Sequence, residues 1–208
     1  MNTFHQSLSR ALLILAFIVP TLAGRVQAAP PDKVQEHFFA AMKAGQEKPA
    51  VAGHTKTVGS PTGLMYSDTL ASGGIIVGFD FWTSNYGKFL VINGVCPIYQ
   101  NAKGRTRGKP HGNRNGNLTT LEARDGYAVS GVTAKAGDRM DQAQVEFMRI
   151  NFATLNLEPG TIYKSKWVGG SGGRYERHLT GGDKPVIGIF GASGDELDRF
   201  GLLFYAPK

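Results

Sequence analysis

From residue 74 onward, apolar residues fall in short runs that are bounded by glycine and asparagine. Runs of this length, rich in valine, isoleucine and phenylalanine, are typical of β-strands, and no helical period competes with them. They predict strands at 74–82, 88–99, 118–124, 127–133, 140–150, 161–168, 184–190 and 200–205. This part of the chain is therefore expected to be all-β.

The first 28 residues show a different pattern. An unbroken apolar run at 11–19 follows Arg10, and small residues that end at Ala28 follow Pro20. This order is typical of a secretory signal, and the run is too short to span a bilayer. We predict a signal peptide at 1–28 and a protein that is secreted or periplasmic after its removal.

Residues 29–55 form a third region between the signal and the strands. Apolar residues repeat at three and four positions from Val34 to Met42, and the pattern stops at Gly45. This predicts a short amphipathic helix followed by a polar linker. The strand-rich domain is expected to occupy 56–208.

Two segments of that domain match each other 57 residues apart without a gap. One reads Gly137-Asp138-Arg139-Met140-Asp141 and the other Gly194-Asp195-Glu196-Leu197-Asp198, and a weaker copy begins at Gly78. Each unit predicts a strand, a tight turn and a returning strand, with Gly137 and Gly194 providing a positive φ. Three such units can bury their apolar faces only against one another, which favours a three-sided β-prism over a solenoid.

The last repeat also carries a family resemblance. Residues 185–203 resemble the closing signature of jacalin-related lectins, an apolar strand that enters a Gly-x-Ser-Gly-x-x-[Leu/Val]-Asp loop. Residues 129–131 look like the middle unit of that family, and 58–63 are similar to its glycine-rich first loop. The resemblance implies a jacalin-like β-prism of three Greek-key units, here preceded by the N-terminal helix. It also implies sugar binding without catalysis, metal or cofactor.

The resemblance places the sugar site in the last loop. It implies that the Asp198 carboxylate accepts sugar hydroxyls, that the amides of Asp195 and Glu196 donate, that Gly194 forms the turn and that Gly63 lies in the facing loop. The Gly-Asp-x-Leu-Asp form is similar to that of the mannose/glucose-binding members. Hydrogen bonds to an ionised carboxylate are among the stronger ones available for gripping hydroxyls.

Two features leave alternatives open at this site. Thr62-Gly63 stands where the family has two glycines, so the threonine side chain is expected to crowd the sugar. Asp195 and Asp198 are equally consistent with plain turn chemistry, in which both carboxylates bond their own main chain.

Gly137, Asp138 and Asp141 have the same spacing and are candidates for a second site. Arg139 and the apparent lack of facing glycines leave a purely structural turn as the alternative. The run 169–173 is interpreted as a flexible hairpin, because a phosphate-binding loop would continue with Lys-Ser/Thr and a helix.

The segment 101–117 gives a rival function. It is rich in basic residues, has no large apolar side chain and is expected to be an exposed loop. Such a loop would suit a polyanion, either a sulfated glycan or nucleic acid, through Lys103, Arg105, Arg107, Lys109 and Arg114. Removal of the predicted signal takes away Arg10 and Arg25 and lowers the net charge from +7 to +5 (21 − 16). This charge is too mild to decide between polyanion binding, a solvated loop and a β-prism scaffold without a sugar ligand.

The sequence gives little support for an enzyme. The histidines lie apart, no nucleophile motif is present, and Asp195 and Asp198 on one turn cannot flank a glycosidic bond from both sides. Cys96 is the only cysteine, so neither an internal disulfide nor a cysteine metal cluster can form. One shallow site should bind a monosaccharide weakly, with a dissociation constant on the order of 1 mM, so useful affinity favours a homo-oligomer.

Overall fold

The computed structural model describes residues 40, 53–154 and 156–205. The predicted signal peptide at 1–28 lies outside these residues, as does the predicted helix and linker at 29–55 except for Ala40 and its last three residues. None of the described residues belongs to a helix long and apolar enough to cross a membrane.

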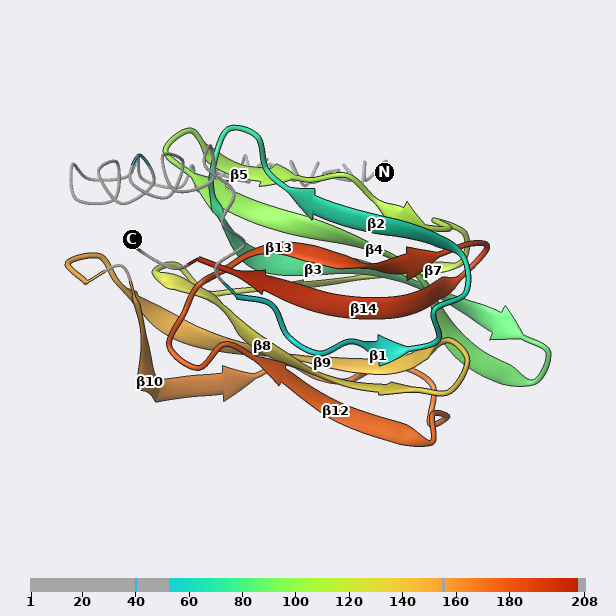
Figure 1. Cartoon of the computed structure of the whole chain (residues 1–208). Coiled ribbons are helices and arrows are strands. Elements are labelled where there is room, and N and C mark those ends of the chain that lie inside the picture. Colours follow the sequence, from blue (N-terminus) through green and yellow to red (C-terminus); the bar gives the residue numbers. More distant parts are fainter. Residues whose placement is uncertain (1–39, 41–52, 155, 206–208) are drawn as a thin grey trace, which may run out of the picture.

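The described chain forms three antiparallel sheets (Figure 1). In spatial order, the first sheet contains β1 (Val58–Gly59), β14 (Leu197–Phe204), β13 (Val186–Ser193) and β2 (Leu64–Thr69). The second contains β10 (Asn156–Lys164), β9 (Met140–Asn151), β8 (Tyr127–Ala136) and β12 (Tyr175–Thr180), with β11 (Val168–Gly169) also paired to β9. The third contains β5 (Gly104–Arg107), β4 (Phe89–Asn101), β3 (Ile75–Tyr86) and β7 (Asn117–Glu122), with β6 (His111–Gly112) also paired to β4.

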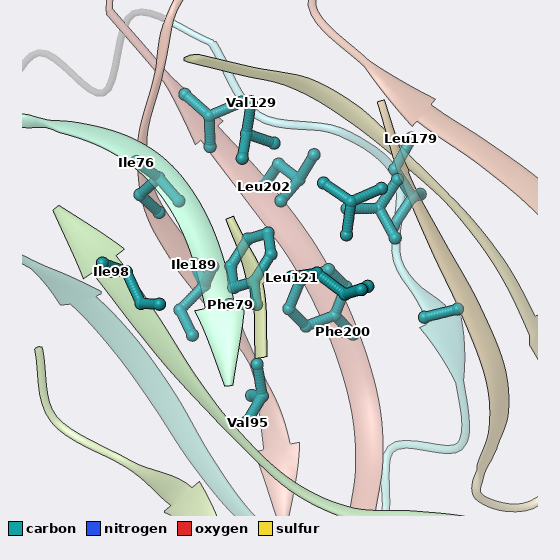
Figure 2. Packing of buried hydrophobic residues seen from close by; sticks show 14 of the residues in the cluster. Ile76, Phe79, Val95, Ile98, Leu121, Val129, Leu179, Ile189, Phe200 and Leu202 are labelled. Carbon is teal, nitrogen blue, oxygen red and sulfur yellow. The ribbon is translucent and has the colours of Figure 1, made fainter. Parts of the chain in front are cut away.

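Each sheet is built on one long hairpin, which is β3–β4, β8–β9 or β13–β14. The inward faces of the three hairpins meet in one apolar core (Figure 2). Phe79 of β3, for example, packs edge-on against Phe200 of β14 with ring centroids 5.9 Å apart, and both are almost fully buried. The three-sided β-prism predicted from the repeats is confirmed.

The N-terminal strands complete the first sheet. β1 pairs with β14 and β2 pairs with β13, so the beginning and the end of the domain share one sheet. The contacts start at Gly53, whose carbonyl accepts from the Phe204 amide, within the segment that the sequence assigns to the linker.

Seven of the predicted strands match an observed strand, from β3 to β14, to within a few residues. The run at 161–168 is different, because it joins the end of β10 to the start of β11. The predicted ranges do not include β1, β2, β5, β6 or β12. β2 and β12 are edge strands with few buried residues, so their sequences lack a continuous apolar run.

The basic side chains of 101–117 are exposed as predicted, but the prediction that the whole segment is a loop is wrong. The segment contains β5 and β6, and His111 is buried, stacked on Tyr66 with ring centroids 4.0 Å apart. Two of its basic side chains, Arg105 and Arg107, pair with acidic residues of neighbouring strands. These partners are distant in sequence, so the pattern of the segment itself does not reveal them.

Candidate functional site

The three short strands β1, β6 and β11 mark equivalent corners of the prism. Each ends in a glycine with positive φ that lies against a main-chain carbonyl of the returning strand of a hairpin. The next amide along the chain donates to that same carbonyl at 2.9–3.0 Å. The glycines are Gly59, Gly112 and Gly169, and the residues that provide the carbonyls are Asp198, Asn93 and Asp141 respectively. Two of the corners therefore carry an aspartate at this last position, and the third carries an asparagine.

At the first corner, the structure brings together two segments that are far apart in sequence. Gly63 has φ +80° and lies beside the Asp198 carboxylate, so close that a Cβ atom would stand 2.5 Å from Asp198 Oδ2. The Asp198 carboxylate also accepts hydrogen bonds from the Gly194 amide and the Thr62 hydroxyl. Only glycine at position 63 leaves space for the acceptor, since any side chain would displace the carboxylate.

The predicted donors lie on the same turn. Gly194 and Asp195 are exposed, Glu196 is half-buried, and Asp198 is 7% exposed. The amides of Asp195 and Glu196 meet no acceptor within the described part of the chain. They are therefore available to a ligand.

The turn chemistry considered for Asp198 is present, but it does not fill the carboxylate. A carboxylate offers about four acceptor positions, and Gly194 and Thr62 use two of them. The Thr62 hydroxyl, which the sequence analysis expected only to crowd a sugar, acts as a donor that fixes the orientation of this acceptor.

Gly194 and Gly137 do not have the predicted positive φ. The amide of Gly137 donates to Asp141 Oδ2 at 3.0 Å and the amide of Gly194 donates to the Glu196 carbonyl at 3.0 Å, while its hydrogen bond to the Asp198 carboxylate lowers the pKa of that group. Their role in the turn is to bring an amide to the carboxylate, which does not require a left-handed backbone.

Burial raises the pKa of Asp198, and the charge of Glu196 acts in the same direction, whereas the nearby Arg139 guanidinium and the two hydrogen bonds oppose the shift. Burial likewise raises the pKa of Asp141, opposed by its hydrogen bond from Gly137 and by Arg139. Both acceptors thus lie in surroundings that disfavour their charged form.

The second corner repeats the first. Gly172 lies beside the Asp141 carboxylate, where a Cβ atom would overlap Oδ1. The run 169–173 is therefore not a flexible hairpin but a crossing loop from β11 to β12 that faces the Asp141 turn. The glycines of this loop are the facing glycines that the second repeat seemed to lack. Asp138, the third candidate residue here, is exposed on the turn.

The third corner is closed. Asn93 replaces the aspartate, and its Nδ2 donates to Ser84 Oγ and to the Asn115 carbonyl. The hairpin β3–β4 also continues past this point to Tyr86 and Phe89 instead of making a short turn. This corner offers neither a carboxylate nor a free amide group on Asn93.

A contact between the corners was missed by the sequence analysis. Arg139 Nε donates to Glu196 Oε2 at 2.9 Å, and the Arg139 guanidinium lies 3.7 Å from the centroid of the Tyr86 ring. Residues of all three hairpin turns therefore meet at one end of the prism. Opposite charges at matching repeat positions were the signal that could have revealed this pair.

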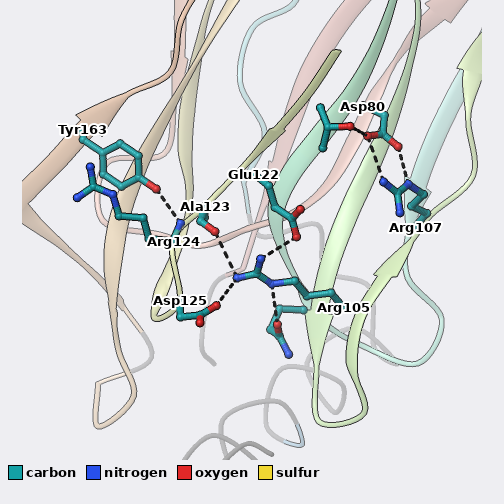
Figure 3. A network of polar contacts seen from close by, with 10 residues as sticks. Asp80, Arg105, Arg107, Glu122, Ala123, Arg124, Asp125 and Tyr163 are labelled. Atoms are coloured by element: carbon teal, nitrogen blue, oxygen red, sulfur yellow. Dashed lines mark hydrogen bonds and ion pairs between the residues drawn. The ribbon is translucent and has the colours of Figure 1, made fainter. Parts of the chain in front are cut away.

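The basic residues proposed for polyanion binding are only partly available. Arg105 bonds Glu122 and Asp125 at 2.8 Å each, and Arg107 Nε bonds the buried Asp80 at 2.6 Å (Figure 3). Lys103, Lys109 and Arg114 are exposed and form no ion pair with a described residue. Two of the five proposed contacts thus already serve the fold.

No group of three or more metal-ligating side chains is found within 53–154 and 156–205. The histidines in those ranges have separate partners: His54 packs against Phe190, His111 meets Asp68, and His178 bonds Glu146.

This three-sided prism is the fold of the jacalin-related lectins. No protein-family model matches the chain, and no curated protein matches it in sequence. Three similar solved structures are Malaysian banana lectin (12% identity, TM-score 0.55, 75% of this chain and 99% of that one), the mannose-binding lectin from Champedak (16%, 0.54, 74% and 99%) and the artocarpin–mannotriose complex (16%, 0.54, 74% and 99%). At this identity the similarity shows the fold.

Proposed function

We propose that this protein is a carbohydrate-binding protein and that its main site is the Asp198 corner. One observation carries the proposal: Gly63 and the Asp198 carboxylate meet across 135 positions of sequence, beside two amides that lack an acceptor. The carboxylate accepts from two sugar hydroxyls, and the amides of Asp195 and Glu196 donate to sugar oxygens. No metal takes part.

The proposed ligands are sugars of the mannose and glucose type. Their adjacent hydroxyls can each donate to one ionised acceptor while accepting from neighbouring amides. In support, the Champedak relative is described as mannose-binding, artocarpin was solved with mannotriose and Calsepa lectin with a bisected glycan.

The Asp141 corner is proposed as a second site of the same kind. It has the same aspartate, the same turn amide and a glycine against the carboxylate. Two sites on one chain would raise the affinity for branched or repeating glycans above that of either site alone. Export by the signal at 1–28, and a homo-oligomer that multiplies the sites further, complete the proposal.

The test is a calorimetric titration of the protein with methyl α-mannoside, methyl α-glucoside and methyl α-galactoside. We expect the mannoside and the glucoside to bind with dissociation constants on the order of 1 mM. Asp198→Asn should remove binding at the main site. Asp183→Asn, which changes an exposed acid away from the corners, is the matched control. Unchanged binding by Asp198→Asn would exclude this site.

Salt separates this function from polyanion binding. Hydroxyl recognition by a partly buried carboxylate should survive an increase from 0.1 to about 1 M salt, whereas phosphate or sulfate binding should weaken steeply. The ion pairs of Arg105 and Arg107 weigh against the polyanion alternative. A chain that binds neither class of ligand would fit the scaffold alternative.

A further inference from the structure

Arg139 and Glu196 occupy the same position in the two repeats. Each is the second residue after the turn glycine, and the two positions are 57 residues apart. Their side chains do not point to separate surroundings but bond each other at 2.9 Å. The two candidate sugar-binding turns are thus joined directly by a side-chain ion pair and not by main-chain hydrogen bonds of a sheet.

The ion pair is more than a surface contact. The Arg139 and Glu196 side chains are only 28% and 19% exposed. The Arg139 guanidinium also lies over the ring of Tyr86, in the turn of the third hairpin. That hairpin is fixed in turn, because the Leu90 carbonyl lies against Gly170 in the loop facing Asp141. Partial burial and the aromatic stack both strengthen the attraction beyond that of an exposed pair.

We propose that Arg139 and Glu196 are positioning residues that brace the two sugar-binding turns against each other, so that each corner depends on a residue of the other. This proposal rests on the proposed function. Donors on a short irregular turn bind a ligand well only when they are already held in place, because ordering them on binding would consume affinity. A single ion pair orders both turns at once.

The surroundings of Arg139 support this role. Burial raises the pKa of both Asp198 and Asp141, and the Arg139 charge opposes the shift at each of them. The guanidinium therefore stabilises the charged form of both acceptors while its hydrogen bond holds Glu196.

The experiment measures each corner separately, by mannoside titration in an Asp141→Asn background for the first corner and in an Asp198→Asn background for the second. We expect Arg139→Met to weaken the first corner about threefold to tenfold, although Arg139 belongs to the second repeat. Glu196→Gln should weaken the second corner in the same reciprocal way. The exchanged pair Arg139→Glu with Glu196→Arg restores the ion pair and should recover most of the loss.

Amide hydrogen exchange provides a readout that needs no sugar. Arg139→Met and Glu196→Gln should each speed exchange at the two hydrogen-bonded turn amides, those of Gly137 and Gly194, and the exchanged pair should slow it again. Lys135→Met is the matched control, because Lys135 pairs with Glu176 near the same turn and this ion pair does not connect the two corners. It should leave exchange at the Gly194 amide unchanged.

The outcomes separate this proposal from the proposed function. If the wild-type chain binds mannoside and Arg139→Met changes neither the first corner nor its amide exchange, the brace is refuted while the lectin function stands. If the wild-type chain binds no sugar, the proposed function fails, and faster exchange in both turns of Arg139→Met still supports the brace. Unchanged exchange would then refute the brace as well.

Discussion

Gly63 lies against the carboxylate of Asp198, with room for a hydrogen atom but not for a methyl group. The two residues belong to the loop before β2 and to β14, so they meet only when the first sheet has joined both ends of the domain. The candidate site is therefore a product of prism closure and not of either segment alone.

Replacing Gly63 by alanine should damage both the site and the fold. A Cβ atom at this position would meet Asp198 Oδ2 and the Ser193 main chain, and the residue has φ +80°. We expect a loss of about 2–4 kcal/mol in urea unfolding and of at least about tenfold in mannoside affinity. Gly126→Ala is the control, because Gly126 has φ +78° with open space around it and should cost only about 1–2 kcal/mol. Equal effects of the two variants would contradict the close approach.

Sugar binding should depend on the ionisation of Asp198. Burial raises the pKa of this carboxyl above the ordinary value of 3.8 for an aspartate. Protonation removes the acceptor, so mannoside affinity should fall as the pH decreases through the raised pKa, earlier than for an exposed aspartate. Titrations between about pH 7 and pH 4 would test this, and an affinity that stays constant over the range would contradict it.

The same pKa shift predicts how stability depends on pH. The folded state holds the Asp198 proton more tightly than the unfolded state, so this group lowers the free energy of unfolding as the pH rises through the window between the two pKa values. Relative to the wild type, Asp198→Asn should therefore lose stability as the pH is lowered from 7 toward 4, because only the wild type is stabilised by protonation of this carboxyl. Urea unfolding of both proteins at several pH values would show this. An Asp198→Asn protein that gains stability relative to the wild type on acidification would contradict it.

Gly172→Ala should weaken the second corner alone. Its Cβ atom would overlap Asp141 Oδ1, so we expect at least about a threefold loss of mannoside affinity in the Asp198→Asn background and none at the first corner. Gly160→Ala, at a site with open space, is the control. A chain in which Gly172→Ala leaves this affinity unchanged does not use the Asp141 corner.

Arg107→Gln should affect stability more than polyanion binding. Arg107 bonds the carboxylate of Asp80, which is 1% exposed and also accepts from Thr120. Removing the arginine leaves a buried charge with a single donor, so we expect a loss of about 1–3 kcal/mol in urea unfolding. Lys109→Gln, at an exposed position, should leave stability unchanged. If heparin binds, and its affinity falls for Arg107→Gln without loss of stability, the basic segment has the rival function.

Much of the prism could be predicted from local pattern. The long hairpin strands bury apolar side chains over most of their length, so their sequences carry continuous runs, and the 57-residue repeat revealed that the hairpins are equivalent. The edge strands β2 and β12 are mostly exposed and left no such signal. Segment 101–117 was misread for a related reason, because Arg105 and Arg107 find their acidic partners on other strands and turns.

The sequence by itself determined the hairpins and their number, because a hairpin is made of neighbouring residues whose alternation and turns are local. It also placed Asp198 and Asp141 at matching turns. Only the tertiary structure decided which loops face them, since the contacts of Gly63 with Asp198 and of Gly172 with Asp141 join segments that do not pair along the chain. The same holds for Arg139 and Glu196: their equivalence is visible in the repeat, but their contact exists because closure of the prism brings the hairpin turns to one end.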